Sequence, residues 1–278
     1  MRFWDLVYIE AYKLLRQRKT YFALVAILVI ELIVIAVALY QGQAILDTLL
    51  RSLQDSFLFE GDLLNGNLLT YLLLNSLWFH IPLILMIILS GTITTEFEDK
   101  SVQTVFLQPV SKTQFLLAKY LVAAAFTELV VFLLAITSFA ISYGFFGQGD
   151  LVVLIESLNF FEAGEAFTRL CWAFVTGIFS MVFFTVMSIT FGVLFRDSIR
   201  TWIVSALALI VANLLTQIDM PFMAMNDWFL PKLLNTWQLF FNYEVPWGNI
   251  VSNLLLMLLY TGLMAWWGIR RFNKRPIG

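Results

Sequence analysis

Six long apolar stretches dominate the chain and limit what it can fold into. A helix that crosses a lipid bilayer needs about 20 predominantly apolar residues, because its backbone polar groups must be satisfied within the helix. Of the 278 residues, 60% are hydrophobic and 13% are charged, which leaves little chain for a soluble catalytic domain. We therefore expect an all-α integral membrane protein that forms one domain over residues 1–278. The predicted spans are residues 21–40, 71–95, 120–146, 170–195, 201–218 and 247–269.

The basic residues predict the orientation of these spans. Six spans place both termini on one side, and only three of the 17 Lys and Arg residues, Arg51, Arg169 and Lys232, then fall on the other side. Basic residues accumulate in cytoplasmic loops. We expect a multi-pass protein of the cell inner (plasma) membrane with both termini in the cytoplasm.

Two regions outside the spans are also apolar. Residues 1–19 have a helical periodicity that predicts an amphipathic helix in the membrane interface. Its apolar face would carry Phe3, Trp4, Val7, Tyr8, Ala11, Leu14 and Leu15, and its polar face Arg2, Asp5, Glu10, Lys13 and Arg16. Residues 219–246 are expected to be re-entrant or to lie on the outer leaflet as short helices. The predicted interfacial anchors are Trp228, Trp237 and Tyr243 within this segment and Trp247 directly after it.

A polar interruption separates the second and third spans at residues 96–112, which we call the 96–112 segment. It opens with the charged run EFEDK and continues with apolar residues among small polar ones, which predicts a short, partly amphipathic helix. Pro109 would end that helix. Ser111 and Gln114 form a capping box that would start the next helix, and Lys119 marks its cytoplasmic end.

This segment resembles the loop after the second span in permease subunits of ABC-2 type exporters. The matching residues are Glu96, Glu98, Lys100, Ser101, Val105, Leu107, Pro109, Val110, Ser111, Lys112 and Lys119. Gln103 departs from the pattern, since many members have Glu there. The resemblance extends along the chain through the amino-terminal helix, six spans, the polar turn RDSIR and the basic tail.

The resemblance implies that the segment couples the spans to a separate ATPase subunit. The residues that it implies for this contact are Glu96, Phe97, Glu98, Asp99, Lys100, Ser101, Val102, Gln103, Val105, Phe106 and Pro109. It implies two ATPase copies, a second permease copy or a related permease, and membrane lipid as partners, with no nucleic acid. The alternative is a charged loop that is merely solvated.

The sequence contains no enzyme motif. No G-x-x-x-x-G-K-[ST] phosphate-binding loop occurs, so we expect ATP and Mg²⁺ to be bound by the partner, and neither a cofactor nor catalytic residues in this chain. His80 is the single histidine and has no second ligand at metal-binding spacing, so no metal site is expected. Apolar faces between two permeases favour an amphipathic or hydrophobic substrate such as a lipid, a peptide or a drug.

Three ionisable residues fall within the predicted spans: Glu31, His80 and Glu128. A charge inside a membrane is costly, so such residues often serve a function. They support an alternative, a proton-coupled secondary transporter or channel in which they relay protons. They could equally be neutral groups on the translocation path or groups that join neighbouring helices by hydrogen bonds.

Overall fold

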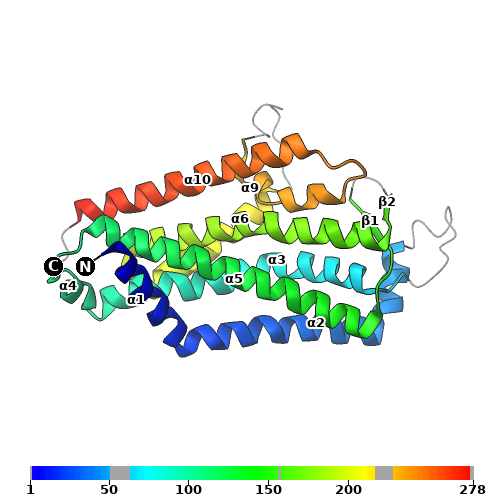
Figure 1. Cartoon of the computed structure of the whole chain (residues 1–278), viewed down its shortest axis with the longest axis horizontal. Coiled ribbons are helices and arrows are strands. Elements are labelled where there is room, and N and C mark those ends of the chain that lie inside the picture. The colour runs from blue at the N-terminus through cyan, green and yellow to red at the C-terminus, as the bar shows by residue number, and fades with distance from the viewer. Residues whose placement is uncertain (1, 51–62, 156–157, 217–227, 276–278) are drawn as a thin grey trace.

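The structure is a computed structural model that describes residues 2–50, 63–155, 158–216 and 228–275 (Figure 1). Six of its helices are long and apolar enough to cross a membrane, which confirms the predicted all-α class with six spans. They are α2 (Arg18–Leu50), α3 (Gly66–Glu98), α5 (Lys112–Phe146), α6 (Ala163–Phe195), α7 (Ser198–Leu215) and α10 (Trp247–Lys274).

Shorter elements connect these helices. They are α1 (Phe3–Arg16), α4 (Ser101–Val105), the strands β1 (Leu151–Leu154) and β2 (Leu158–Phe161), α9 (Leu230–Leu233) and the 3₁₀ helix η1 (Thr236–Phe241). The two strands form an antiparallel hairpin in which Leu151 pairs with Phe161. The sequence did not predict this hairpin. Part of the predicted outer segment, residues 219–227, lies outside the described residues.

The helices are longer than the apolar stretches because polar caps set their ends. The side chain of Asn65 accepts hydrogen bonds from the backbone N–H groups of Asn67 and Leu68, so α3 begins at Gly66 rather than near residue 71. Ser111 accepts from the N–H of Gln114 at 3.2 Å, so α5 begins at Lys112 rather than near residue 120.

Helices α3 and α6 are the most buried spans and form the centre of the bundle. Their backbones approach closely where α6 has glycine. A Cβ atom at Gly177 would overlap the Trp78 ring, and one at Gly192 would lie 2.7 Å from the Ile93 side chain. Gly192 follows Ser188 by four residues, and this spacing of small residues on one helix face permits close packing in membranes.

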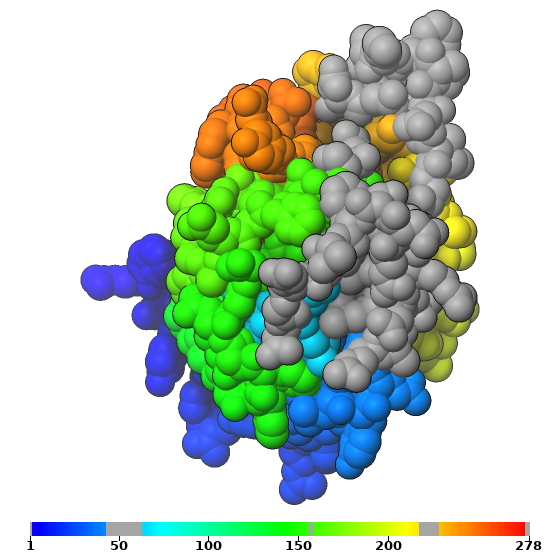
Figure 2. Space-filling view, turned by 90° about the vertical axis from the view of Figure 1, so that its right-hand side faces the viewer, coloured from blue at the N-terminus to red at the C-terminus, as the bar shows by residue number. Residues whose placement is uncertain are grey.

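Different elements lie at the two ends of the bundle. Both termini and α4 lie at one end, which we call the terminal end, and the β-hairpin lies at the other, which we call the hairpin end (Figure 1). Seen from the hairpin end, α2 and α10 lie at opposite margins of the molecule (Figure 2).

Trp237 is not an interfacial anchor, and that prediction was wrong. It is buried, with its ring centroid 5.0 Å from that of Trp78, because η1 packs its aromatic side chains against the spans. The other three predicted anchors, Trp228, Tyr243 and Trp247, are exposed.

Candidate functional site

The 96–112 segment forms a tight, ordered turn at the terminal end. Helix α3 ends at Glu98, and Lys100 adopts a left-handed backbone conformation (φ 56°) that reverses the chain into α4. The hydroxyl of Ser101 donates to the carbonyl oxygen of Glu96 at 3.3 Å, which holds the start of α4 against the end of α3. The predicted short helix is therefore present, with five residues.

Apolar residues of the segment face the bundle. Phe97 and Phe106 both contact Phe272 of α10, with ring centroids 6.1 Å apart in each case, and Phe106 also contacts Phe115 of α5. Val102 is buried. These side chains dock the segment onto the spans.

The outward surface of the segment is mixed in character. Its exposed residues are Glu98, Asp99, Lys100, Gln103, Thr104, Leu107, Gln108, Pro109 and Ser111. Leu107 is 86% exposed and places an apolar side chain on this outward surface. Leu107 belongs to the family pattern but not to the predicted ATPase-contact residues, because periodicity alone does not tell which apolar residue points outward.

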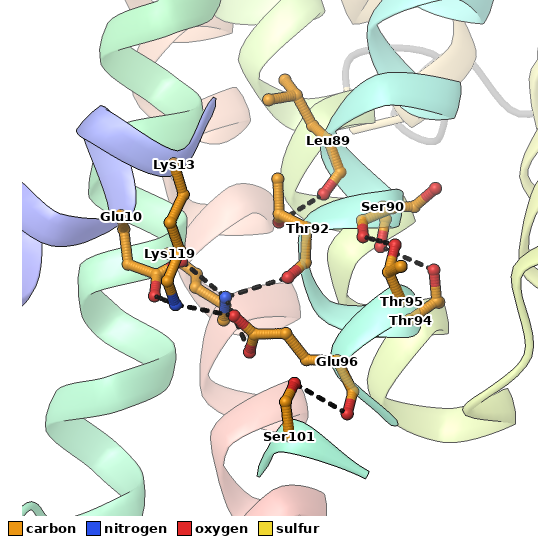
Figure 3. Close-up of polar contacts among 11 residues, drawn as sticks. Glu10, Lys13, Leu89, Ser90, Thr92, Thr94, Thr95, Glu96, Ser101 and Lys119 are labelled. Carbon is orange, nitrogen blue, oxygen red and sulfur yellow. Dashed lines mark hydrogen bonds and ion pairs between the residues drawn. The ribbon is translucent and has the colours of Figure 1, made fainter. Parts of the chain in front are cut away.

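Beneath the segment lies a network of four charged side chains from three helices (Figure 3). The ammonium group of Lys119 in α5 lies 2.6 Å from Glu10 Oε2 of α1 and 3.1 Å from Glu96 Oε2 of α3, and it donates to the carbonyl oxygen of Thr92 at 2.9 Å. Lys13 lies 2.8 Å from Glu10 Oε1 and 2.9 Å from Glu96 Oε1. Two cations thus alternate with two carboxylates, and the charges balance.

The ion pairs keep Glu10 and Lys13 charged, and both residues belong to α1, which lies outside the spans. Burial is the largest influence on Glu10 and raises its pKa, but the fields of Lys119 and Lys13 together lower the pKa below its ordinary value. Burial lowers the pKa of Lys13, but Glu10 and Glu96 raise it above its ordinary value. Both groups are therefore ionised at neutral pH.

One residue of the predicted polar face of the amino-terminal helix lies elsewhere. Glu10 was expected on the face opposite the apolar residues, yet it is buried on the same side as Leu6 and Leu14. Tyr8 and Trp4, assigned to the apolar face, are exposed, as expected for side chains that would contact lipid. The reason is tertiary, since the partner of Glu10 is Lys119, 109 positions away. The four-residue spacing of Leu6, Glu10 and Leu14 was the signal that could have placed this carboxylate inward.

Glu98 connects the segment to a different helix. Its carboxylate accepts a 2.6 Å hydrogen bond from the backbone N–H of Ser198, the first residue of α7. The hydroxyls of Thr94 and Ser198 are 2.8 Å apart. The RDSIR turn, which carries Asp197 as N-cap of α7, therefore contacts the end of α3 directly. Anions at a helix N-terminus are favourable because they pair with free N–H groups there.

A cavity of about 530 Å³ adjoins the network between α1, α3 and α4. Its lining combines acidic and basic side chains with the small residues Gly91, Thr92 and Ser101.

The structure does not bring the three intramembrane ionisable residues together. Glu31 is buried and accepts hydrogen bonds from Thr137 (3.0 and 2.8 Å) and Ser138 (2.7 Å) of α5. His80 is exposed, with Nδ1 2.8 Å from the carbonyl oxygen of Ser76, and Glu128 is exposed on α5. Within the described residues, no hydrogen bond or ion pair links these three groups. Glu31 has the geometry of a group that joins α2 to α5.

The sequence of residues 6–213 matches a protein family described as ABC-2 family transporter protein. The chain belongs to this family. The match extends from α1 into α7 and includes the whole ion-pair network, whereas α9, η1 and α10 lie beyond it. Members are membrane components of ABC transporters rather than catalytic subunits, and membership implies partnership with an ABC ATPase. No curated protein matches the chain.

Proposed function

We propose that this protein is the permease subunit of an ATP-driven exporter that carries an amphipathic or hydrophobic substrate out of the cytoplasm. A separate ATPase subunit would bind ATP and Mg²⁺ and supply the energy. The assembly would contain two ATPases and two permeases, the second permease being another copy or a related chain. The basic residues near the terminal end support a cytoplasmic location for that end and for both termini.

The observation that carries this proposal is how the 96–112 segment is mounted. It presents an exposed surface around Leu107, while Glu96 and Glu98 at its base connect to other helices. A partner that displaces the segment therefore moves α3 together with α1 and α5 through Glu96, and with α7 through Glu98. A solvated loop would not need this linkage.

The exposed leucine gives the sharpest test. In the proposed complex, Leu107→Asp places a carboxylate in the ATPase contact without changing any internal packing. We expect the tagged variant, extracted gently from its native membrane, to retain about one tenth or less of the ATPase that co-purifies with the wild type, since a charged group without a partner in a contact costs more than about 1–3 kcal/mol and about 1.4 kcal/mol is tenfold in affinity. The ATPase is recognised by its phosphate-binding loop in mass spectrometry.

The matched control is Leu154→Asp on β1, where the leucine is 57% exposed at the hairpin end. This variant should recover the ATPase as the wild type does. Equal recovery by both variants, or recovery of the wild-type permease without an ATPase, would contradict the proposal. Glu98→Lys is a poorer probe, because it also removes the hydrogen bond to the N-terminus of α7.

A further inference from the structure

A second cavity, of about 770 Å³, lies between η1 and the first turns of α10. It is near the end of α10 that points away from the two termini (Figure 1). Its walls carry an unusual density of side-chain amides for a helix that crosses a membrane. The polar residues that matter are Asn235, Gln238, Asn242, Asn249, Ser252 and Asn253.

One wall is a polar face on a helix that is otherwise apolar. Asn249, Ser252 and Asn253 are spaced by three and four residues, so they share one side of α10. Other sides of the same turns expose Val251 and Leu255, as expected for a surface in lipid. The amides are thus confined to the side that faces the cavity.

The opposite wall is rigid. Asn235, Gln238 and Asn242 follow one another at about one turn along η1, whose aromatic residues Trp237, Phe240 and Phe241 are buried against the spans. The Arg169 guanidinium donates 2.6 Å hydrogen bonds to the carbonyl oxygens of Phe240 and Asn242, which holds the end of η1 in place. The wall is therefore formed before any ligand binds.

Most of these amides have no partner among the residues that the structure describes. Among the described residues, none donates to or accepts from the side-chain amides of Asn235, Gln238, Asn242 and Asn249. Asn253 differs, since its amide donates to the Thr236 hydroxyl at 3.1 Å. Each primary amide offers two donors and one acceptor oxygen, which water satisfies in the empty cavity. A ligand that displaces this water must replace both kinds of hydrogen bond.

We propose that this cavity binds an uncharged, hydroxyl-rich glycosyl group, either of a free saccharide or of a glycolipid head group. Hydroxyls donate and accept, which matches an array of amides. Among the described residues, the cavity lining includes one cation, Lys232, and no Asp or Glu, so no described residue there selects a cationic ligand. Trp228, which is exposed and lines the cavity, offers an apolar face to the C–H groups of a sugar ring.

The walls argue against an extended peptide as the ligand. Peptides that bind along a protein backbone usually add to an open sheet edge, and both walls here are helical. Reading the site as the substrate's binding site rests on the proposed export function. Binding of the glycosyl group itself does not, because the residues that would bind it all belong to this chain.

The test measures binding to the full-length permease in phosphatidylcholine nanodiscs, without an ATPase. The probes are maltose, diglucosyl diacylglycerol, the same diacylglycerol without sugar, and trialanine. We expect saturable binding of at least one sugar-bearing probe and none of plain diacylglycerol. Asn249→Leu and Gln238→Met, each nearly isosteric and made singly, should each weaken binding up to about tenfold, the effect of one lost hydrogen bond.

The matched control is Asn75→Leu, an exposed amide on α3 that donates to the Tyr71 carbonyl oxygen at 3.3 Å and does not line this cavity. Its affinity should equal that of the wild type. Binding of maltose identifies a soluble saccharide as a sufficient ligand, whereas binding of the glycolipid alone identifies a head group. No binding of either, equal affinity in all variants, or trialanine binding that Asn249→Leu weakens would overturn the proposal. If sugar binds although the Leu107→Asp experiment contradicts the export proposal, then sugar binding by this site does not depend on the export function.

Discussion

Replacing Lys119 with Met is the most direct test of the ion-pair network. Lys119 is 2% exposed and lies within ion-pair distance of both Glu10 and Glu96. Met preserves most of the side-chain volume, so the packing against Phe115 is largely kept while the charge is removed. Two carboxylates then share Lys13 as their single remaining cation in the network, and one negative charge in this buried site becomes uncompensated.

The expected cost follows from the burial of the partner left behind. Removing one member of a buried ion pair costs about 3–5 kcal/mol, because the other member stays desolvated without compensation. The side chain of Glu10 is 5% exposed, but that of Glu96 is 14% exposed and Lys13 still contacts both carboxylates. These contacts place the expected loss at the lower end of the range, about 3 kcal/mol.

The measurement is reversible unfolding in mixed micelles, followed by tryptophan fluorescence. Adding Glu10→Gln to Lys119→Met restores the charge balance, so the double variant should be more stable than Lys119→Met alone. Lys274→Met, at an exposed lysine in the last turn of α10, is the control and should match the wild type. A loss below about 1 kcal/mol for Lys119→Met, or strictly additive effects in the double variant, would refute the reasoning.

Three further expectations follow from single residues. Because the folded-state pKa of Glu10 lies below its ordinary value of 4.5, its contribution to stability should be present at neutral pH and be lost as the pH falls below about 4.5. Limited proteolysis of α1 across this pH range should show the loss, and Glu10→Gln should flatten the profile. Gly192→Val should destabilise the bundle by about 1–3 kcal/mol by pushing α6 from Ile93, whereas Gly262→Ala, with open space around it, should not in the same unfolding assay. Glu31→Gln should leave transport by the reconstituted complex intact, whereas an obligatory proton relay through Glu31 would make transport fail.

Much of the fold could be predicted because membrane insertion depends on local hydropathy. Six spans followed from the lengths of the apolar stretches alone, since any helix in lipid must be apolar over its whole length. The helix ends were less predictable. Asn65 and Ser111 extend α3 and α5 beyond their apolar stretches by capping, and a cap acts wherever its side chain reaches free N–H groups.

The candidate site was only partly predictable. The order of residues in the 96–112 segment identified the turn and its family, but not which side chains point inward. Phe106 and Leu107 are neighbours of similar hydrophobicity, yet Phe106 contacts Phe272 and Leu107 is exposed. This difference depends on where α10 lies, and nothing within the segment encodes it.

The sequence by itself determined that this is a six-span membrane protein of the ABC-2 family, because apolar length and residue order are properties of each stretch alone. Only the tertiary structure decided which charges compensate one another. Glu10, Glu96 and Lys119 come from three helices, and each would be costly to bury alone. Their burial is tolerable because the helices pack so that the charges meet. A buried charge is compensated only by a group of opposite charge beside it, and the packing of the helices brings the two groups together.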